Sequence, residues 1–90
     1  MEVNKKRLDE QEIKALNVTS WPVWEKEASE FDWYYDSTEE FYVIEGKVEV
    51  CYGQNQKIEF AAGDFVTFPA GTTCRWKVIE AIRKYYRFVD

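Results

Sequence analysis

Histidine is missing from this 90-residue chain, and cysteine, proline, glycine and methionine are all scarce. Two cysteines cannot define a disulfide framework, so we expect Cys51 and Cys74 to be free thiols. Without histidine, the chain lacks the commonest metal-ligating side chain and the usual general base near neutral pH. Any metal or acid–base chemistry must therefore come from carboxylates, thiols, phenols or amines.

Long apolar runs and an excess of basic residues are also missing. No run approaches the roughly 20 residues of a membrane span, and the charged start MEVNKKRLDEQ lacks the apolar centre of a signal peptide. The net charge is −5, and the twelve Lys and Arg residues are spread along the chain, unlike the basic patch of a nucleic-acid-binding protein. We therefore expect a cytoplasmic protein that binds neither membranes nor nucleic acid.

Aromatic residues, by contrast, are abundant. They make up 18% of the chain, and apolar residues as a whole make up 46%, which is enough to close the core of one small domain over residues 1–90. The high Glu and Lys content is compatible with a thermophilic source. The composition predicts a small globular domain.

One short helix is predicted at about residues 10–16. Asp9 and Glu12 have the spacing of a capping box, and Leu8 and Ile13 have the spacing of a hydrophobic staple. The helix is therefore expected to begin directly after Asp9.

The remainder of the chain, about residues 21–89, has the pattern of short β-strands. Seven segments rich in β-branched and aromatic residues are separated by Gly, Pro, Asn or Asp signals: FDWYYD, EFYVIEG, KVEVCYG, QKIEFAAG, DFVTFPAG, CRWKVIE and AIRKYYRFV. Because no helix separates them, they predict an all-β antiparallel sandwich or barrel.

Alternation along these strands assigns the two cysteines to opposite faces. Cys51 alternates with the apolar residues of KVEVCY, which include Tyr52, so it is expected to point outward. Cys74 belongs to the apolar set of CRWKVIE and is expected to point into the barrel. In EEFYVIEG both faces are apolar, and if Phe41 points inward then Glu39 does too.

The last predicted strand presents a lysine to the interior. Its more apolar face carries Ile82, Lys84, Tyr86 and Phe88. The opposite face, which is expected to meet solvent, carries Arg83, Tyr85 and Arg87. Lys84 is therefore expected beside the aromatic lining.

The glycine and proline spacing resembles the two motifs of the cupin superfamily, G-x5-H-x-H-x3,4-E-x6-G and G-x5-P-x-G-x2-H-x3-N. EEFYVIEG supplies Glu39 and, after six residues, Gly46. GDFVTFPAGTTC supplies Gly63, Pro69 and Gly71, followed by a cysteine where the motif has histidine. The segments WPVWEKEASEFDWYYD, EGKVEV, RWKV and RKYY resemble the short single-domain cupins of Thermotoga, in the branch of ureidoglycine aminohydrolase and the ethanolamine-utilisation cupins. The resemblance implies an antiparallel jelly-roll β-barrel.

The histidine positions of the first motif hold Trp33 and Tyr35 with one spacing, or Asp32 and Tyr34 with the other. A tryptophan side chain cannot ligate a metal. Imidazole suits Zn²⁺ and Fe²⁺, so its absence removes the usual source of affinity, and we expect no metal cofactor. The alternative is a divalent Zn, Fe or Mn ion, for which the available side chains are Glu39, Cys74 and Tyr35.

These assignments converge on one pocket inside the barrel. The expected ligand-binding residues are Trp33, Tyr35, Glu39, Phe41, Cys74, Trp76 and Lys84. An apolar cavity with a few convergent polar groups is typical of a small-molecule site. A purely structural pair of Glu39 and Lys84 is an equal alternative. By base rate, Cys74 is a small buried apolar side chain next to Trp76.

Three functions are compatible with this pocket. We favour a barrel that binds a small polar metabolite, such as a carboxylate or amide that meets Lys84 and Tyr35. The resemblance also implies an enzyme of ureide or amine metabolism, dependent on a metal, with Glu39 as acid/base and a metal or Lys84 as its electrophilic partner. The third function is a non-catalytic interaction module. Because cupins commonly pair, we expect a homodimer, with the segment around Pro22 and Trp24 as a pairing arm.

Overall fold

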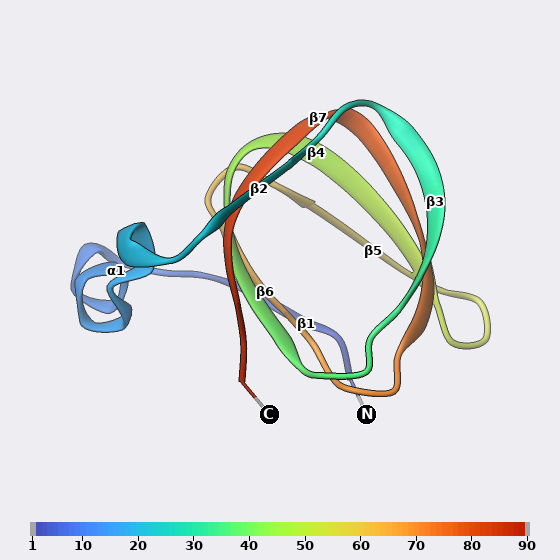
Figure 1. Ribbon diagram of the computed structural model, residues 1–90, viewed down its shortest axis with the longest axis horizontal. Helices are drawn as coiled ribbons and strands as arrows, with labels where there is room; N and C mark the ends of the chain where they lie inside the picture. The colour runs from blue at the N-terminus through green and yellow to red at the C-terminus, as the bar shows by residue number, and fades with distance from the viewer. Residues whose placement is uncertain (1, 90) are drawn as a thin grey trace.

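Two long antiparallel strands organise the fold in the computed structural model, which describes residues 2–89 (Figure 1). β4 (Glu39–Tyr52) and β7 (Thr73–Phe88) pair along almost their whole lengths. The sequence predicted a break in each of them, but the chain bends there without leaving the sheet. The bend coincides with shifts in the β4–β7 register between Val43 and Val48.

Gly46 explains why β4 bends instead of ending. Its φ is +104°, and a Cβ at this position would collide with the backbone of Ala81 and Ile82 on β7. A glycine therefore lets the two strands approach closely while an irregular register turns them.

Four shorter strands flank this bent pair, and each of them pairs with one half of β4 or of β7. β6 (Asp64–Phe68) and β5 (Gln56–Ala61) pair with the first and second halves of β4. β3 (Ser29–Tyr34) and β2 (Val23–Lys26) pair with the first and second halves of β7. All pairs are antiparallel, and the strands curve around one shared interior (Figure 1).

β1 (Asn4–Arg7) was not predicted. Its sequence, NKKR, has no apolar alternation, and all four residues are exposed. Main-chain pairing with β6 holds it in place, and Arg7 Nε lies 3.1 Å from Asp64 Oδ1. A strand held by such contacts leaves no hydrophobic pattern in the sequence.

The predicted helix is confirmed as α1 (Glu10–Leu16), and both hydrogen bonds of the capping box are present. Asn17 ends the helix in the left-handed conformation, with φ 54°. No residue of α1 is buried, and the helix stands to one side of the barrel (Figure 1). Val18, in the short 3₁₀ turn Val18–Ser20, is fully buried and anchors the segment that carries α1. No helix within residues 2–89 has the length and apolar character needed to cross a membrane.

Aromatic rings form the centre of the core. Phe60 packs against Phe41 and Trp76 with ring centroids 5.2 and 5.5 Å away, in edge-to-face or nearly edge-to-face orientation. As predicted, Cys74 is buried and Cys51 is exposed. The period-two pattern therefore assigned both cysteines to the correct face.

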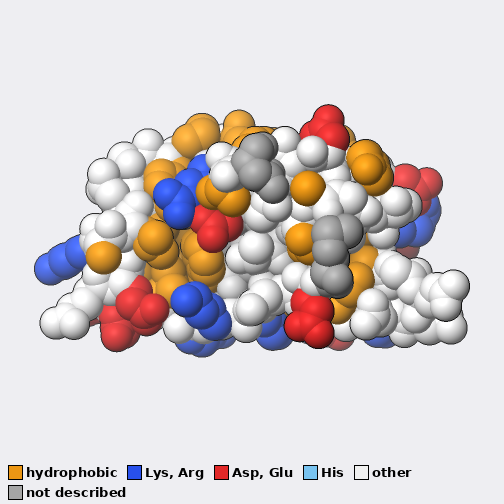
Figure 2. Space-filling view, turned by 90° about the horizontal axis from the view of Figure 1, so that it is seen from below, with side chains coloured by type: hydrophobic (Ala, Val, Ile, Leu, Met, Phe, Trp, Pro, Cys, Tyr) orange, Lys and Arg blue, Asp and Glu red, His pale blue; other side chains and the backbone are white. Residues whose placement is uncertain are grey.

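The outer face of the barrel carries alternating charges. Arg83 and Arg75 point outward and form ion pairs with acidic residues of β2 and β3. The prediction that Arg87 faces solvent is wrong in part: its guanidinium stacks on Trp21 at 4.5 Å and binds Glu40, so it is half-buried. Figure 2 shows one face of this surface, where hydrophobic side chains form patches separated by acidic and basic groups.

Candidate functional site

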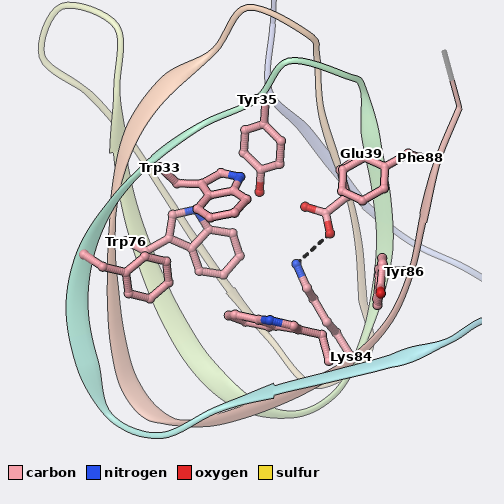
Figure 3. A pocket seen from close by; sticks show the side chains of 9 residues that line it. Trp33, Tyr35, Glu39, Trp76, Lys84, Tyr86 and Phe88 are labelled. Carbon is pink, nitrogen blue, oxygen red and sulfur yellow. Dashed lines mark hydrogen bonds and ion pairs between the residues drawn. The ribbon is translucent and has the colours of Figure 1, made fainter.

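A cavity of ≈ 290 Å³ opens into the barrel beside β2, β3 and the second half of β7 (Figure 3). Seven of its nine lining residues are aromatic, and the other two are buried charged residues. The lining residues are Trp24, Phe31, Trp33, Tyr35, Glu39, Trp76, Lys84, Tyr86 and Phe88. Trp33 and Phe88 form the rim, where their side chains are 50% and 53% exposed.

Strand alternation explains how these side chains reach one space. Phe31, Trp33 and Tyr35 are spaced two residues apart along β3 and just beyond it, so they share one face. Trp24 lies opposite Lys84 in the β2–β7 register, so both can turn into the cavity. Four strands, β2, β3, β4 and β7, thus supply lining residues.

An ion pair lies at the centre of the cavity. Lys84 Nζ is 2.8 Å from Glu39 Oε2, and each residue is only 4% exposed. The ammonium also lies over ring faces, 3.9 Å from the centroid of Phe41, 4.8 Å from that of Trp76 and 4.9 Å from that of Trp24. Burial lowers the pKa of Lys84, and the Glu39 carboxylate opposes that change.

Tyr35 points into the cavity toward this pair (Figure 3). Main-chain hydrogen bonds fix its position, since its N–H donates to Thr72 O at 2.9 Å and its carbonyl accepts from Gly71 N. Its ring stacks on Phe68 with centroids 4.9 Å apart. Burial, together with the Glu39 carboxylate, raises the pKa of Tyr35 above its ordinary value, so the phenol keeps its proton and can donate a hydrogen bond.

Cys74 and Trp76 lie at the inner edge of this group. Burial raises the pKa of the Cys74 thiol from 9.0 to about 11. The thiol donates to Trp33 O at 3.5 Å. Within residues 2–89, the buried Nε1 of Trp76 has no hydrogen-bond acceptor. The interior therefore holds several protonated donors and one carboxylate.

Two of the expected lining residues do not line the cavity. Phe41 is fully buried in the core, and the Lys84 ammonium lies over its ring. Cys74 points inward but is also part of the core, with its short side chain held against the backbone of Trp33. Alternation predicts the face of a residue, but it does not predict how deep the side chain lies.

The structure brings the other expected residues together, namely Trp33, Tyr35, Glu39, Trp76 and Lys84. Their role in binding stays a prediction. The two spacings of the first cupin motif left open whether Asp32 or Trp33 faces inward. Asp32 points outward and pairs with Arg75 at 2.9 Å, so Trp33 turns to the cavity. Phe31 was missed, although its spacing of two and four residues from Trp33 and Tyr35 is a visible signal.

Trp24, in the segment expected as a pairing arm, is also a wall of the chain's own cavity, and the pairing itself stays a prediction. Its ring packs against Trp76 and Phe31 at 6.0 and 6.4 Å. The carbonyl of Pro22 accepts a hydrogen bond from Tyr86 N at 3.0 Å. No local pattern in the sequence indicates this contact between distant strands.

A barrel of antiparallel strands with a side-chain-lined interior site is the architecture of a cupin. Residues 13–86 match the model of the family described as "EutQ-like cupin domain", and the chain belongs to this family. The predicted cupin resemblance and jelly-roll fold are thus confirmed.

Solved structures agree with this assignment. A DUF861-family protein from Thermotoga maritima is 50% identical over 98% of this chain and 100% of that chain, with a TM-score of 0.96. The EutQ protein of Clostridium difficile shares the fold at 21% identity, over 96% of this chain and 66% of that chain, with a TM-score of 0.68. A putative ethanolamine utilization protein Q from Salmonella typhimurium does so at 19% identity, over 98% and 69% of the two chains, with a TM-score of 0.66. No curated protein matches the chain.

Proposed function

We propose that this cupin binds a small molecule in its aromatic cavity without a metal ion, and that Lys84 supplies the fixed positive charge of the site. The observation that carries the proposal is the 2.8 Å pair of Lys84 and Glu39, which is buried yet lines an open cavity. Buried charges are costly unless paired, and titratable groups with perturbed pKa values in a cleft cluster at functional sites.

The side chains present do not fit a divalent ion. Glu39, which matches the glutamate of the cupin motif, already binds the Lys84 ammonium. The phenol of Tyr35 and the thiol of Cys74 both have raised pKa values, so each keeps the proton that a metal ligand must lose. Within residues 2–89, no three His, Cys, Asp or Glu side chains gather in a metal-binding arrangement.

The cavity chemistry favours a flat ligand with an acidic or amide end. A volume of ≈ 290 Å³ lies at the lower end of the usual range for small-molecule pockets, so the ligand is small. Lys84 has N–H donors beyond the one used by Glu39, and Tyr35 offers an O–H. A carboxylate or amide oxygen can accept from both, while ring faces pack against the rest of the molecule.

A thermal-shift panel tests ligand binding. Benzoate, benzamide, small ureides and amino alcohols are each added at rising concentration, because a ligand bound only by the folded state raises Tm by mass action. We expect benzoate or benzamide to raise Tm and the amino alcohols to have no effect. The proposal fails if no carboxylate or amide shifts Tm at millimolar concentration.

Two neighbouring tyrosines provide a matched pair of variants. Tyr35→Phe removes only the hydroxyl that points into the cavity, and we expect it to weaken benzoate binding about fivefold to tenfold. Tyr34→Phe removes the hydroxyl of an exposed neighbour, 58% accessible, and is expected to leave the affinity unchanged. Equal effects of the two variants would contradict this placement of the ligand.

Metal content is tested separately. Protein purified without chelator is subjected to elemental analysis, and its melting curve is recorded before and after EDTA. We expect little bound metal and an unchanged Tm. Near-stoichiometric zinc, iron or manganese together with a lower Tm after chelation would overturn the metal-free proposal.

A further inference from the structure

We propose that Lys84 is a covalent capture residue, whose amine condenses reversibly with a small aldehyde or ketone in the cavity to form an imine. This inference rests on the proposed small-molecule site and adds to it a substrate class and a reacting atom. The amine lines the cavity, and within residues 2–89 its only charged hydrogen-bond partner is Glu39, at 2.8 Å.

Lys84 differs from every other lysine of the chain in its surroundings. The other seven are exposed, whereas Lys84 is 4% exposed and surrounded by ring faces. A desolvated lysine loses part of the hydration that stabilises its ammonium form, which makes the neutral, nucleophilic amine more accessible. The lowered pKa of Lys84 is in keeping with this environment.

Glu39 is positioned to move the protons that condensation requires. Its carboxylate accepts a proton from the ammonium, and the neutral amine then attacks the carbonyl carbon. A C–N bond forms, the C=O π bond breaks, and the oxygen takes a proton from the attacking nitrogen to become a hydroxyl. Protonation of that hydroxyl by the Glu39 carboxyl releases water and leaves a C=N bond. Aldehyde and amine thus give imine and water, with no oxidation or reduction.

Tyr35 and the aromatic wall complete the site. The phenol, which keeps its proton, points toward the pair and can donate a hydrogen bond to the carbonyl oxygen (Figure 3). A protonated imine keeps the positive charge of the ammonium, so it retains the attraction of Glu39 and of the rings of Phe41, Trp76 and Trp24. Condensation therefore does not leave the carboxylate unpaired.

Reductive trapping tests the proposal on the full chain. The protein is incubated at pH 7 with benzaldehyde and sodium cyanoborohydride, which reduces the imine to a stable amine, and peptide mass mapping locates the adduct. We expect Lys84 to be modified at least about tenfold faster than any exposed lysine, and benzoate to slow this reaction. Adducts confined to exposed lysines would overturn the proposal.

Variants separate the chemistry from the fold. Lys84→Arg keeps a positive charge beside Glu39 and is expected to abolish the fast adduct. Glu39→Gln keeps the amine and is expected to slow trapping at Lys84 about tenfold or more, while trapping at the exposed Lys77 is unchanged. Melting curves of both variants establish that they are folded, and unchanged trapping at Lys84 in a folded Glu39→Gln protein would refute the role of the carboxylate.

The pH profile gives a readout that a structural pair would not change. The groups that face the Lys84 amine are the carboxyl of Glu39, the phenol of Tyr35 and the thiol of Cys74. Because the pKa of Lys84 is lowered, its trapping rate should level off at a lower pH than that of Lys77. Matching profiles would contradict the proposal.

The two proposals can fail separately. If benzoate raises Tm but Lys84 is not trapped, binding stands and the imine is refuted. If neither occurs, both proposals are refuted.

Discussion

Arg83 and Lys84 are consecutive residues of β7, yet they face opposite sides of the barrel wall. Arg83 Nε lies 3.1 Å from Glu25 Oε1 on the outer surface, where the two side chains are 46% and 68% exposed. Lys84 Nζ lies 2.8 Å from Glu39 Oε2 inside, where the two side chains are 4% and 6% exposed. The N–O distances of the two pairs differ by 0.3 Å, from 3.1 Å outside to 2.8 Å inside.

Their environments make these pairs physically different. Water and salt screen the outer pair, so either partner can be lost at little cost. The inner pair has replaced its hydration with ring faces and one opposite charge, so the loss of one partner leaves an uncompensated charge. Burial, and not the distance between the charges, gives the inner pair its energetic and chemical importance.

The largest effect is expected when the inner pair is broken. Lys84→Met leaves the Glu39 carboxylate buried without its cation and should lower the free energy of unfolding by about 3–5 kcal/mol, measured by urea denaturation. The double variant Glu39→Gln/Lys84→Met removes both charges and should recover most of that loss. A single variant that costs less than about 1 kcal/mol would show that the pair is well hydrated in solution.

The two cysteines extend the comparison to thiol chemistry. A pKa raised from 9.0 to about 11 lowers the thiolate fraction of Cys74 at pH 8 about a hundredfold, and burial also hinders access. In a Cys51→Ser protein, a thiol reagent should therefore react with Cys74 about a hundredfold more slowly in the folded than in the unfolded chain. In a Cys74→Ala protein, the exposed Cys51 should react readily without unfolding. Fast labelling of Cys74 in the folded protein would contradict its placement in the core.

The smallest effect is expected at the outer pair. Arg83→Met should lower the free energy of unfolding by only about 0.2–1 kcal/mol, and this loss should shrink in 1 M salt because exposed charges are screened. The loss caused by Lys84→Met should depend much less on salt. If both variants responded equally to salt, the contrast between the inner and outer faces would be wrong.

Local patterns in the sequence predicted the features that depend on one segment at a time. The Asp9 and Glu12 capping box set the start of α1, and period-two alternation placed Cys74 inside and Cys51 outside. Alternation also predicted that Lys84 points inward and that Glu39 shares the face of Phe41, and the structure buries all three. These features follow from backbone geometry that neighbouring residues share.

Other features had no local signal. β1 has no apolar pattern, because main-chain pairing with β6 and contacts such as Arg7 with Asp64 hold it. β4 continues through Gly46, because the close approach of β7 needs a residue without a Cβ. Phe41 lies beneath the Lys84 side chain, a relation between two strands that neither strand reveals alone.

The sequence by itself determined the all-β class, the helix and the direction in which most side chains point, because each depends on turns and alternation within a few residues. Only the tertiary structure decided that Glu39 and Lys84, 45 residues apart, meet at 2.8 Å and that Trp24 closes the wall beside them. Contacts of this kind depend on how the bent strands pair across the barrel, because pairing sets the register and depth at which inward side chains meet.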